Sequence, residues 1–415
     1  TTPLIKPPSK MIDIESIRRQ FPILTRKVHG KPLIYLDNAA SSQTPERVVR
    51  AVDSMYETTK ANVHRGVHAL SQEATALQEE SRRRVAEYIN SPSPEQVIFT
   101  RGTTEAINLV AASYGGFFRD GDEIILTVME HHANIVPWQL LRRHADVKIK
   151  VVDILPDGTL DLDMYRGLFS ERTRMAAFCH VSNVLGTVNP VAEMTAIAHM
   201  HGVPVLVDGA QAAPHIHIDV QEIGCDFYVF SSHKMYGPTG VGVLYGRREL
   251  LEKMPPYQGG GEMIKHVSFE GTTFADLPFK FEAGTPDYVD IAAFRSALDF
   301  IDSVGIEKMA EHEHALLKHC EERLRTEIPG ILIYGTAPGK SAVISFNVEG
   351  IHNYDLGMLI DGMGVAVRTG HHCAQPLMER LGIQGTVRAS FAVYNTMEEA
   401  DAFVDALKKA VAIFG

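Results

Sequence analysis

A lysine at the end of an apolar run is the residue of this sequence best placed to act as a nucleophile. Lys234 follows the run 227–230 and the polar residues 231–233, and a dense turn signal at 237–240 comes after it. An amine that is partly removed from water loses its charge and attacks carbonyl groups, as in Schiff-base chemistry. Most lysines are solvated surface residues, so Lys234 by itself does not establish a site.

Two further segments carry groups suited to a planar, phosphorylated cofactor. Asp208 follows an apolar run and opens the stretch DGAQ, which ends at Gln211. An aspartate in this position can keep a pyridinium nitrogen protonated, which makes a pyridoxal ring an effective electron sink. Thr103 and Thr104 begin a helical pattern, and the free N–H groups of a helix N-terminus suit a phosphate. Each motif alone is also explained by ordinary helix capping.

A histidine and a cysteine are candidates for proton transfer and nucleophilic attack. His131, in the stretch EHHAN, can stack on a planar cofactor and carry a proton, because imidazole titrates near neutral pH. Cys373 ends the stretch RTGHHC, whose arginine and two histidines favour the reactive thiolate form. The other cysteines lie in or beside apolar patterns typical of packing residues: Cys179, Cys225 and Cys320.

The composition is that of an ordinary globular protein. The 415 residues are 45% hydrophobic and 22% charged, and the net charge of -11 argues against a general nucleic-acid or anionic-membrane surface. No apolar run approaches the roughly 20 residues that a membrane helix needs. Four cysteines without CxxC spacing favour reduced thiols, so we expect a reducing, cytoplasmic location.

Short apolar runs alternate with helical patterns through most of the chain. The helical patterns cover 105–114, 135–145 and 191–201. This alternation predicts an α/β fold with a mostly parallel sheet and helices on both faces, where binding sites form at the carboxyl ends of the strands. The expected strands are 97–100, 123–127, 147–152, 175–178, 203–207, 227–230 and 240–245.

The pattern changes at about residue 291. Long helices at 306–327 and 397–414 flank strands near 342–347 and 364–368, which predicts a smaller α+β domain. Thr396 and Glu399 form a capping box at the start of the last helix. The expected units are a flexible tail at 1–10, a large cofactor-binding domain at 11–290, whose opening segment is a candidate to pack on the small domain, and a small domain at 291–415 that carries the cysteine loop.

A series of ordered segments resembles the SUF-type cysteine desulfurases, the NifS/CsdB-like branch of the class V pyridoxal-phosphate enzymes. The resemblance runs from about residue 17 to the C-terminus, and RTGHHC indicates this branch. It implies a class V aminotransferase-like fold, also called fold type I. The segments are IYLDNAASSQ, VHRGVH, FTRGTTEAINLVA, MEHHANIVPW, HVSNVLGT, VDGAQA, FSSHKMYGPTGVGVLYG, FEAGTP, RTGHHCAQPLM and RASFAVYNT.

The resemblance implies a role for each matching residue. The cofactor is pyridoxal 5'-phosphate, joined to Lys234 as a Schiff base, with Asp208 on the pyridine nitrogen, His131 against the ring and Gln211 near the ring hydroxyl. The residues implied at the phosphate are Thr103, Thr104, Ser231 and His233, with Thr285 reaching over from the neighbouring subunit of a homodimer. The residues implied at the substrate are Asn183 and Arg388 at its carboxylate, and Arg368 and His64 along the pocket.

The implied reaction converts L-cysteine to L-alanine and transfers the sulfur to Cys373 as a persulfide. In it, Lys234 removes the α-proton, Arg388 orients the substrate carboxylate, and His131 takes part in proton transfer. A SUF-system acceptor protein then receives the sulfur for iron–sulfur cluster assembly.

Alternatives remain open at this point. L-Selenocysteine presents the same carboxylate and amine, so a selenocysteine lyase is one alternative; an aminotransferase or another β-lyase on the same scaffold is a second. A metal-dependent hydrolase would use the histidine pairs at 131–132 and 371–372, but HExxH and CxxC spacings are absent, and Lys234 and Asp208 would have no role. The presence of every candidate catalytic side chain argues against an inactive scaffold.

Overall fold

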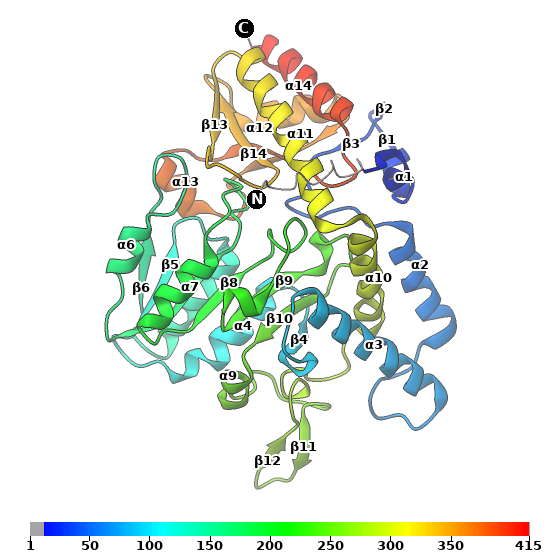
Figure 1. Cartoon of the computed structure of the whole chain (residues 1–415), viewed down its shortest axis with the longest axis vertical. Coiled ribbons are helices and arrows are strands. Elements are labelled where there is room, and N and C mark those ends of the chain that lie inside the picture. Colours follow the sequence, from blue (N-terminus) through cyan, green and yellow to red (C-terminus); the bar gives the residue numbers. More distant parts are fainter. Residues whose placement is uncertain (1–11, 415) are drawn as a thin grey trace, which may run out of the picture.

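The computed structural model describes residues 12–414, and the predicted tail at 1–10 lies outside the described residues. The structure has two main parts. One is a large sheet with its covering helices, and the other, above the large sheet in Figure 1, is a smaller sheet flanked by the C-terminal helices. Within residues 12–414, every helix is too short or too polar to span a membrane.

Seven strands form the central sheet, as predicted from the alternating pattern. Neighbouring strands pair in parallel from β9 through β8, β7 and β5 to β6. The strand β10 pairs antiparallel with both of its neighbours, β4 and β9. In spatial order the strands are β4 (Val97–Thr100), β10 (Gly242–Gly246), β9 (Phe227–Ser231), β8 (Val205–Asp208), β7 (Thr173–Cys179), β5 (Glu123–Thr127) and β6 (Lys148–Val152).

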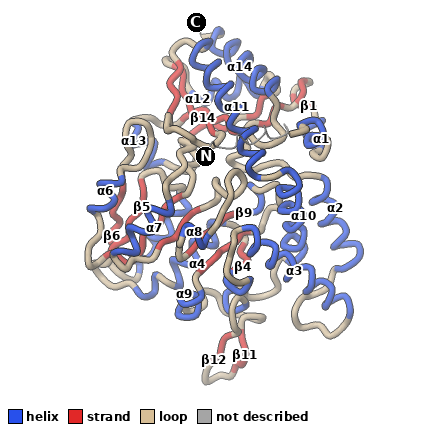
Figure 2. Tube along the Cα trace, in the orientation of Figure 1, coloured by secondary structure: helices blue, strands red, loops and turns tan. Residues whose placement is uncertain are grey.

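Both faces of this sheet are buried because successive side chains of a strand point in opposite directions. In β9, Phe227 and Val229 join the core that includes Trp138, whereas Tyr228 and Phe230 join the core on the other face. Figure 2 shows helices on both sides of the strands. The first face is covered by α4 (Thr103–Ser113) and α5 (Val136–Leu140), and the second by α3 (Ala69–Tyr88), α7 (Val191–Met200) and α10 (Tyr288–Val304). The predicted α/β class with helices on both faces is confirmed.

A second sheet of four antiparallel strands has its own core. Its buried residues come from the strands and from the helices α11, α12 and α14, with Leu36 of the N-terminal segment among them. The capping box of Thr396 and Glu399 is present at α14 as predicted. The elements are β13 (Ile331–Tyr334), β14 (Val343–Val348), β17 (Thr386–Ser390), β16 (Arg368–Gly370), α11 (Ile306–Glu327), α12 (Asn353–Asp361) and α14 (Met397–Ala412). The predicted domain boundaries stay a prediction.

Two expected elements differ from the structure. The single strand predicted at 364–368 is wrong: β15 (Val365–Ala366) pairs in parallel with β3 (Ile34–Tyr35), and β16 pairs with β17. The N-terminal segment supplies the partner of β15, and local periodicity carries no information about such a distant partner. The helix predicted at 135–145 ends early, because α5 gives way to a 3₁₀ turn at Leu141–Arg143.

Candidate active site

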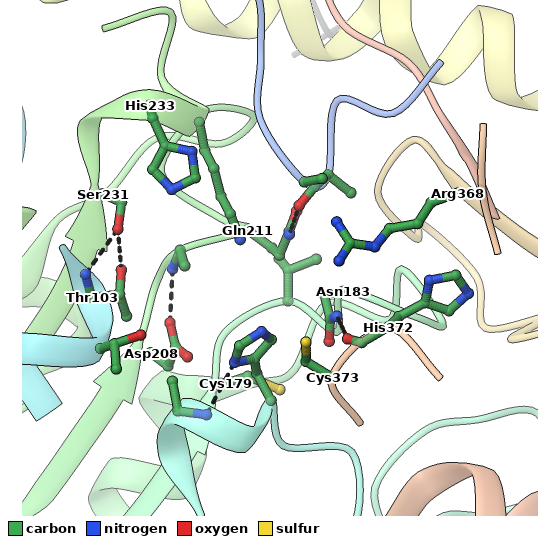
Figure 3. Close-up of a pocket in the computed structure, with 18 of the residues that line it drawn as sticks. Thr103, Cys179, Asn183, Asp208, Gln211, Ser231, His233, Arg368, His372 and Cys373 are labelled. Carbon is green, nitrogen blue, oxygen red and sulfur yellow. Dashed lines mark hydrogen bonds between the residues drawn. The ribbon is translucent and has the colours of Figure 1, made fainter. Parts of the chain in front are cut away.

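A cavity of about 190 Å³ lies where the strands of the large sheet end and the small sheet begins. Figure 3 shows side chains from both parts of the chain surrounding it. Such a position, at the carboxyl ends of parallel strands, is the usual one for sites in α/β proteins. The predicted site residues that line it are Thr103, Thr104, His131, Asn183, Asp208, Gln211, Ser231, His233, Lys234, Arg368, Cys373 and Arg388.

Two predicted site residues lie elsewhere. His64 does not line the cavity; its Nε2 atom is 3.2 Å from the carboxylate of Glu79 on α3. Thr285 is exposed and borders a separate depression that also includes Tyr257. The prediction for Thr285 concerns a neighbouring subunit, so it stays a prediction.

Thr103 and Ser231 form a cradle at the N-terminus of α4. The Thr103 N–H donates to Ser231 Oγ at 2.8 Å, and the two hydroxyl oxygens are 2.7 Å apart. This contact depends on Gly242 of β10, since a Cβ atom there would lie 2.3 Å from Gly102 Cα. Hydroxyl groups beside the positive end of a helix form a site for a phosphate, and His233 lines the same side of the cavity.

Lys234 and Asp208 supply opposite charges to the cavity. Burial lowers the pKa of Lys234 to about 8, although the Asp208 carboxylate opposes the shift; Arg388 and Arg368 reinforce it. A much larger fraction of this amine is therefore neutral near pH 7 than for a free lysine. Burial raises the pKa of Asp208, opposed by a hydrogen bond from the Ala210 N–H (3.0 Å) and by Lys234. A cationic ring nitrogen beside Asp208 would favour its carboxylate form, so the pair fits a pyridoxal ring.

His131 is neutral and has a defined tautomer. Its Nδ1 atom accepts from the Ala133 N–H at 3.0 Å, so the remaining ring proton is on Nε2. Burial, followed by the charge of Lys234, lowers the pKa of His131 to about 3. The buried carboxylate of Glu130 anchors this turn by accepting from the Asn134 side chain (2.7 Å) and from the Cys179 N–H (3.0 Å).

Arg388 is buried at the boundary between the two sheets. It donates to the Asn183 carbonyl at 3.0 Å and to the Asp37 carboxylate at 3.2 Å. Burial lowers its pKa to about 10, so the guanidinium stays charged at neutral pH. Its Nε atom has no hydrogen-bond partner among the described residues. An unpaired buried donor of this kind suits a carboxylate ligand.

Cys373 lies in a strained loop beside these groups. His372 and Cys373 both have left-handed backbone angles, with φ of 51° and 56°, which non-glycine residues rarely adopt. The Asn183 side chain donates to the His372 carbonyl at 2.7 Å, and the buried His372 ring is 2.8 Å from the Thr386 hydroxyl. Figure 3 shows the Cys373 sulfur beside Asn183. Cys373 is partly exposed, whereas the other three cysteines are buried, and all four are free.

Sequence reasoning did not assign several residues that line the cavity. Ala39 and Ala40 come from the stretch IYLDNAASSQ, and the Ala39 carbonyl accepts from the Gln211 side chain at 2.6 Å. Asp37 of the same stretch pairs with Arg388. The resemblance included this stretch, but no role was assigned to any residue in it. His372 and Cys179 line the cavity as well.

The metal alternative lacks a ligand set. In the part of the chain that the structure describes, no three histidine, cysteine or acidic side chains are grouped to hold a metal ion. His132 and His371 do lie together, with ring centroids 5.5 Å apart, but they form only a pair.

The chain matches one protein family over most of its length. The model of the aminotransferase class-V family matches residues 34–403. A cysteine desulfurase of Klebsiella pneumoniae (strain 342) is 52% identical over 404 residues, which cover 97% of this chain and 99% of that protein.

Solved structures give the same result. The cysteine desulfurase CsdA of Escherichia coli superposes with a TM-score of 0.90 at 39% identity, over 97% of this chain and 100% of that chain. A cysteine desulfurase of Thermococcus onnurineus NA1 has a TM-score of 0.92 at 38% identity, over 97% and 99% of the two chains. The chain therefore belongs to the cysteine desulfurases of the class-V aminotransferase family.

Proposed function

We propose that this protein converts L-cysteine to L-alanine with pyridoxal phosphate held by Lys234, and that Cys373 receives the sulfur as a persulfide. One observation supports this proposal above the others: an amine with a pKa of about 8 and the most exposed thiol of the chain line one cavity. The family implies pyridoxal phosphate as the cofactor.

The residues present fit this cofactor. Lys234 would hold it covalently, Asp208 would keep its ring nitrogen protonated, and the cradle of Thr103 and Ser231 would bind its phosphate. His131 would lie against the ring. When bound, pyridoxal phosphate supplies an electron sink for negative charge at the α-carbon of an amino acid.

The chain's own residues perform the remaining tasks. Arg388 is charged, and its Nε–H has no partner within residues 12–414, so it binds and orients the substrate carboxylate. The Lys234 amine is partly neutral near pH 7, so it can take the α-proton. His131 is neutral because its pKa is lowered. Its Nε2–H therefore acts as a hydrogen-bond donor toward the substrate and not as an acid that gives up a proton.

Cys373 completes the reaction at the sulfur atom. Its thiolate attacks the substrate sulfur, a new S–S bond forms and the Cβ–S bond breaks, and the carbon fragment gains a proton to become alanine. Cysteine and the Cys373 thiolate thus give alanine and the Cys373 persulfide, with atoms and charge in balance. Partial exposure of Cys373 lets the persulfide pass to an acceptor protein of the SUF system.

A homodimer belongs to the same proposal. The hairpin of β11 (Ile264–Val267) and β12 (Thr272–Phe274) projects from the molecule in Figure 1 and exposes Val267, Phe269 and Phe274. Clustered apolar side chains of this kind mark a protein interface. A second copy of the chain on this side would cover them, and Thr285 would then face the neighbouring phosphate site.

The test is product analysis with the cofactor-loaded protein. L-Cysteine and a reductant should give equimolar alanine and sulfide with the wild type, and neither product with Cys373→Ala or Cys373→Ser. Alanine from the Cys373→Ala variant would contradict the role proposed for Cys373. Pyruvate, ammonia and sulfide in place of alanine would support a β-lyase, and a sulfur-bearing 2-oxo acid would support an aminotransferase. L-Selenocysteine assayed in parallel separates the selenocysteine lyase alternative.

A further inference from the structure

The turn at 131–134, which follows strand β5 of the large sheet, contacts the cysteine loop at two points. The main-chain N–H of His132 donates to the Cys373 carbonyl at 2.7 Å. The imidazole Nε2 of the same residue accepts from the Gln375 N–H at 3.1 Å. These two contacts reach the loop at Cys373 and Gln375. The Asn183 side chain binds the loop at a third point, the His372 carbonyl.

The second contact defines the state of the His132 ring. A main-chain amide can only donate a hydrogen bond, so the Nε2 atom facing Gln375 carries no proton, and the ring is neutral with its proton on Nδ1. Burial and the neighbouring His371 ring lower the pKa of His132, which agrees with a neutral ring at physiological pH. Only the neutral form can accept this hydrogen bond.

The loop needs such contacts because its backbone is strained. Left-handed angles at His372 and Cys373 persist only where surrounding groups fix them. Without the acceptor at His132, the Gln375 N–H would lose this partner, and we expect the segment from Cys373 to Gln375 to shift relative to the cavity. The same turn also carries His131. Glu130 fixes this turn through hydrogen bonds from the Asn134 side chain and the Cys179 N–H.

We propose that His132 is a positioning residue for sulfur transfer: its main-chain N–H and neutral imidazole together hold Cys373 at the cavity in the pose that attacks the substrate sulfur. This proposal rests on the function proposed above. His132 does not contact the reacting atoms, and its effect is exerted through the loop. A single short turn therefore sets the places of both the ring-facing His131 and the sulfur-accepting Cys373.

The experiment compares His132→Phe with His132→Gln. Phenylalanine keeps a planar ring but has no acceptor, whereas the glutamine amide oxygen can still accept from Gln375 N–H; both variants keep the main-chain N–H. Cysteine alkylation by iodoacetamide is followed for each of the four cysteines by peptide mass spectrometry. This measurement requires neither substrate nor cofactor. Persulfide formation on Cys373 is then measured in a single turnover with loaded protein.

We expect opposite changes in the two measurements for His132→Phe. Cys373 should be alkylated several-fold faster, while persulfide formation should fall by about tenfold or more, because a reacting atom displaced by an ångström loses much of its rate. In His132→Gln, the alkylation rate of Cys373 and the rate of persulfide formation should both stay close to the wild-type values. The buried cysteines at 179, 225 and 320 should remain protected, and the visible absorbance of the bound cofactor should not change.

Three results would overturn the inference. The first is unchanged alkylation and persulfide formation at Cys373 in His132→Phe. The second is faster alkylation of all four cysteines, which would show general loosening of the fold. The third is a glutamine variant as defective as the phenylalanine one. A wild type that makes no alanine would instead refute the proposed function, and the alkylation arm would still decide the role of His132.

Discussion

The two halves of the cavity are built in different ways. On the large-sheet side, Asp208, Ser231 and Thr103 are buried at the ends of regular strands or at a helix start, where the backbone is fixed by many hydrogen bonds. On the other side, Cys373 is in a strained loop that a few contacts from Asn183 and His132 hold in place. In the proposed function, the first half keeps a cofactor through every turnover. The second accepts a sulfur atom and then gives it up, so a loop with few contacts would suit it.

This comparison predicts that changes on the large-sheet side abolish the reaction, whereas changes in the loop's supports only slow sulfur transfer. The largest effect is expected for Lys234→Ala. Loss of both the covalent anchor and the α-proton acceptor should lower alanine formation by at least about a thousandfold. The measurement is alanine per minute with L-cysteine, together with the visible absorbance of the cofactor. Lys148→Ala, at an exposed lysine of β6, serves as the matched control and should keep full activity.

The second prediction concerns pH. Because the pKa of Lys234 is lowered to about 8, its neutral form appears at lower pH than in a free lysine, whose pKa is about 10.4. Uptake of pyridoxal phosphate by cofactor-free protein should therefore accelerate about tenfold between pH 7 and pH 9 and then level off. Stopped-flow absorbance measures this rate. A rate that still rises in proportion to hydroxide up to pH 10 would show that the cavity does not lower the pKa of this amine.

The smallest effect is expected from a support of the loop. Thr386→Val removes the hydroxyl that lies 2.8 Å from the His372 ring and keeps the shape of the side chain. Loss of one buried hydrogen bond corresponds to about 1 kcal/mol, so persulfide formation should slow by roughly threefold to tenfold. Thr386→Ser retains the hydroxyl and should behave like the wild type. Cofactor absorbance should be the same in all three proteins; a variant that loses its cofactor would contradict the separation of the two halves.

The sequence predicted the large-sheet half well. The bounds of β4 and β5 agree with the predicted runs, and β9 is longer by one residue. Asp208 and Lys234 were identified from the strands that precede them, because a residue at the carboxyl end of a buried parallel strand must face the same edge of the sheet. Nearly all the residues named from the family resemblance line one cavity, except His64 and Thr285.

The loop half was predicted less completely. Cys373 was identified from its neighbours in the sequence, but the short strands β15 and β16 were merged into one. The contact between His132 and Gln375 left no trace in the sequence, where His132 entered only as part of a histidine pair in the metal alternative, which the missing metal-site spacings argued against. The ion pair of Arg388 with Asp37 was also missed, since a strand and a distant N-terminal segment form it together.

The sequence by itself determined the strands of the large sheet, the side chains that stand at their ends, and the chemistry open to those side chains. These properties depend on periodicity and turn residues over a few positions, so they can be read locally. Only the tertiary structure decided that the cysteine loop meets the turn at 131–134 and that Asn183 and Arg388 join them. The physical reason is that these contacts form where loops and side chains from distant parts of the chain meet at the cavity, and their separation along the chain gives no signal.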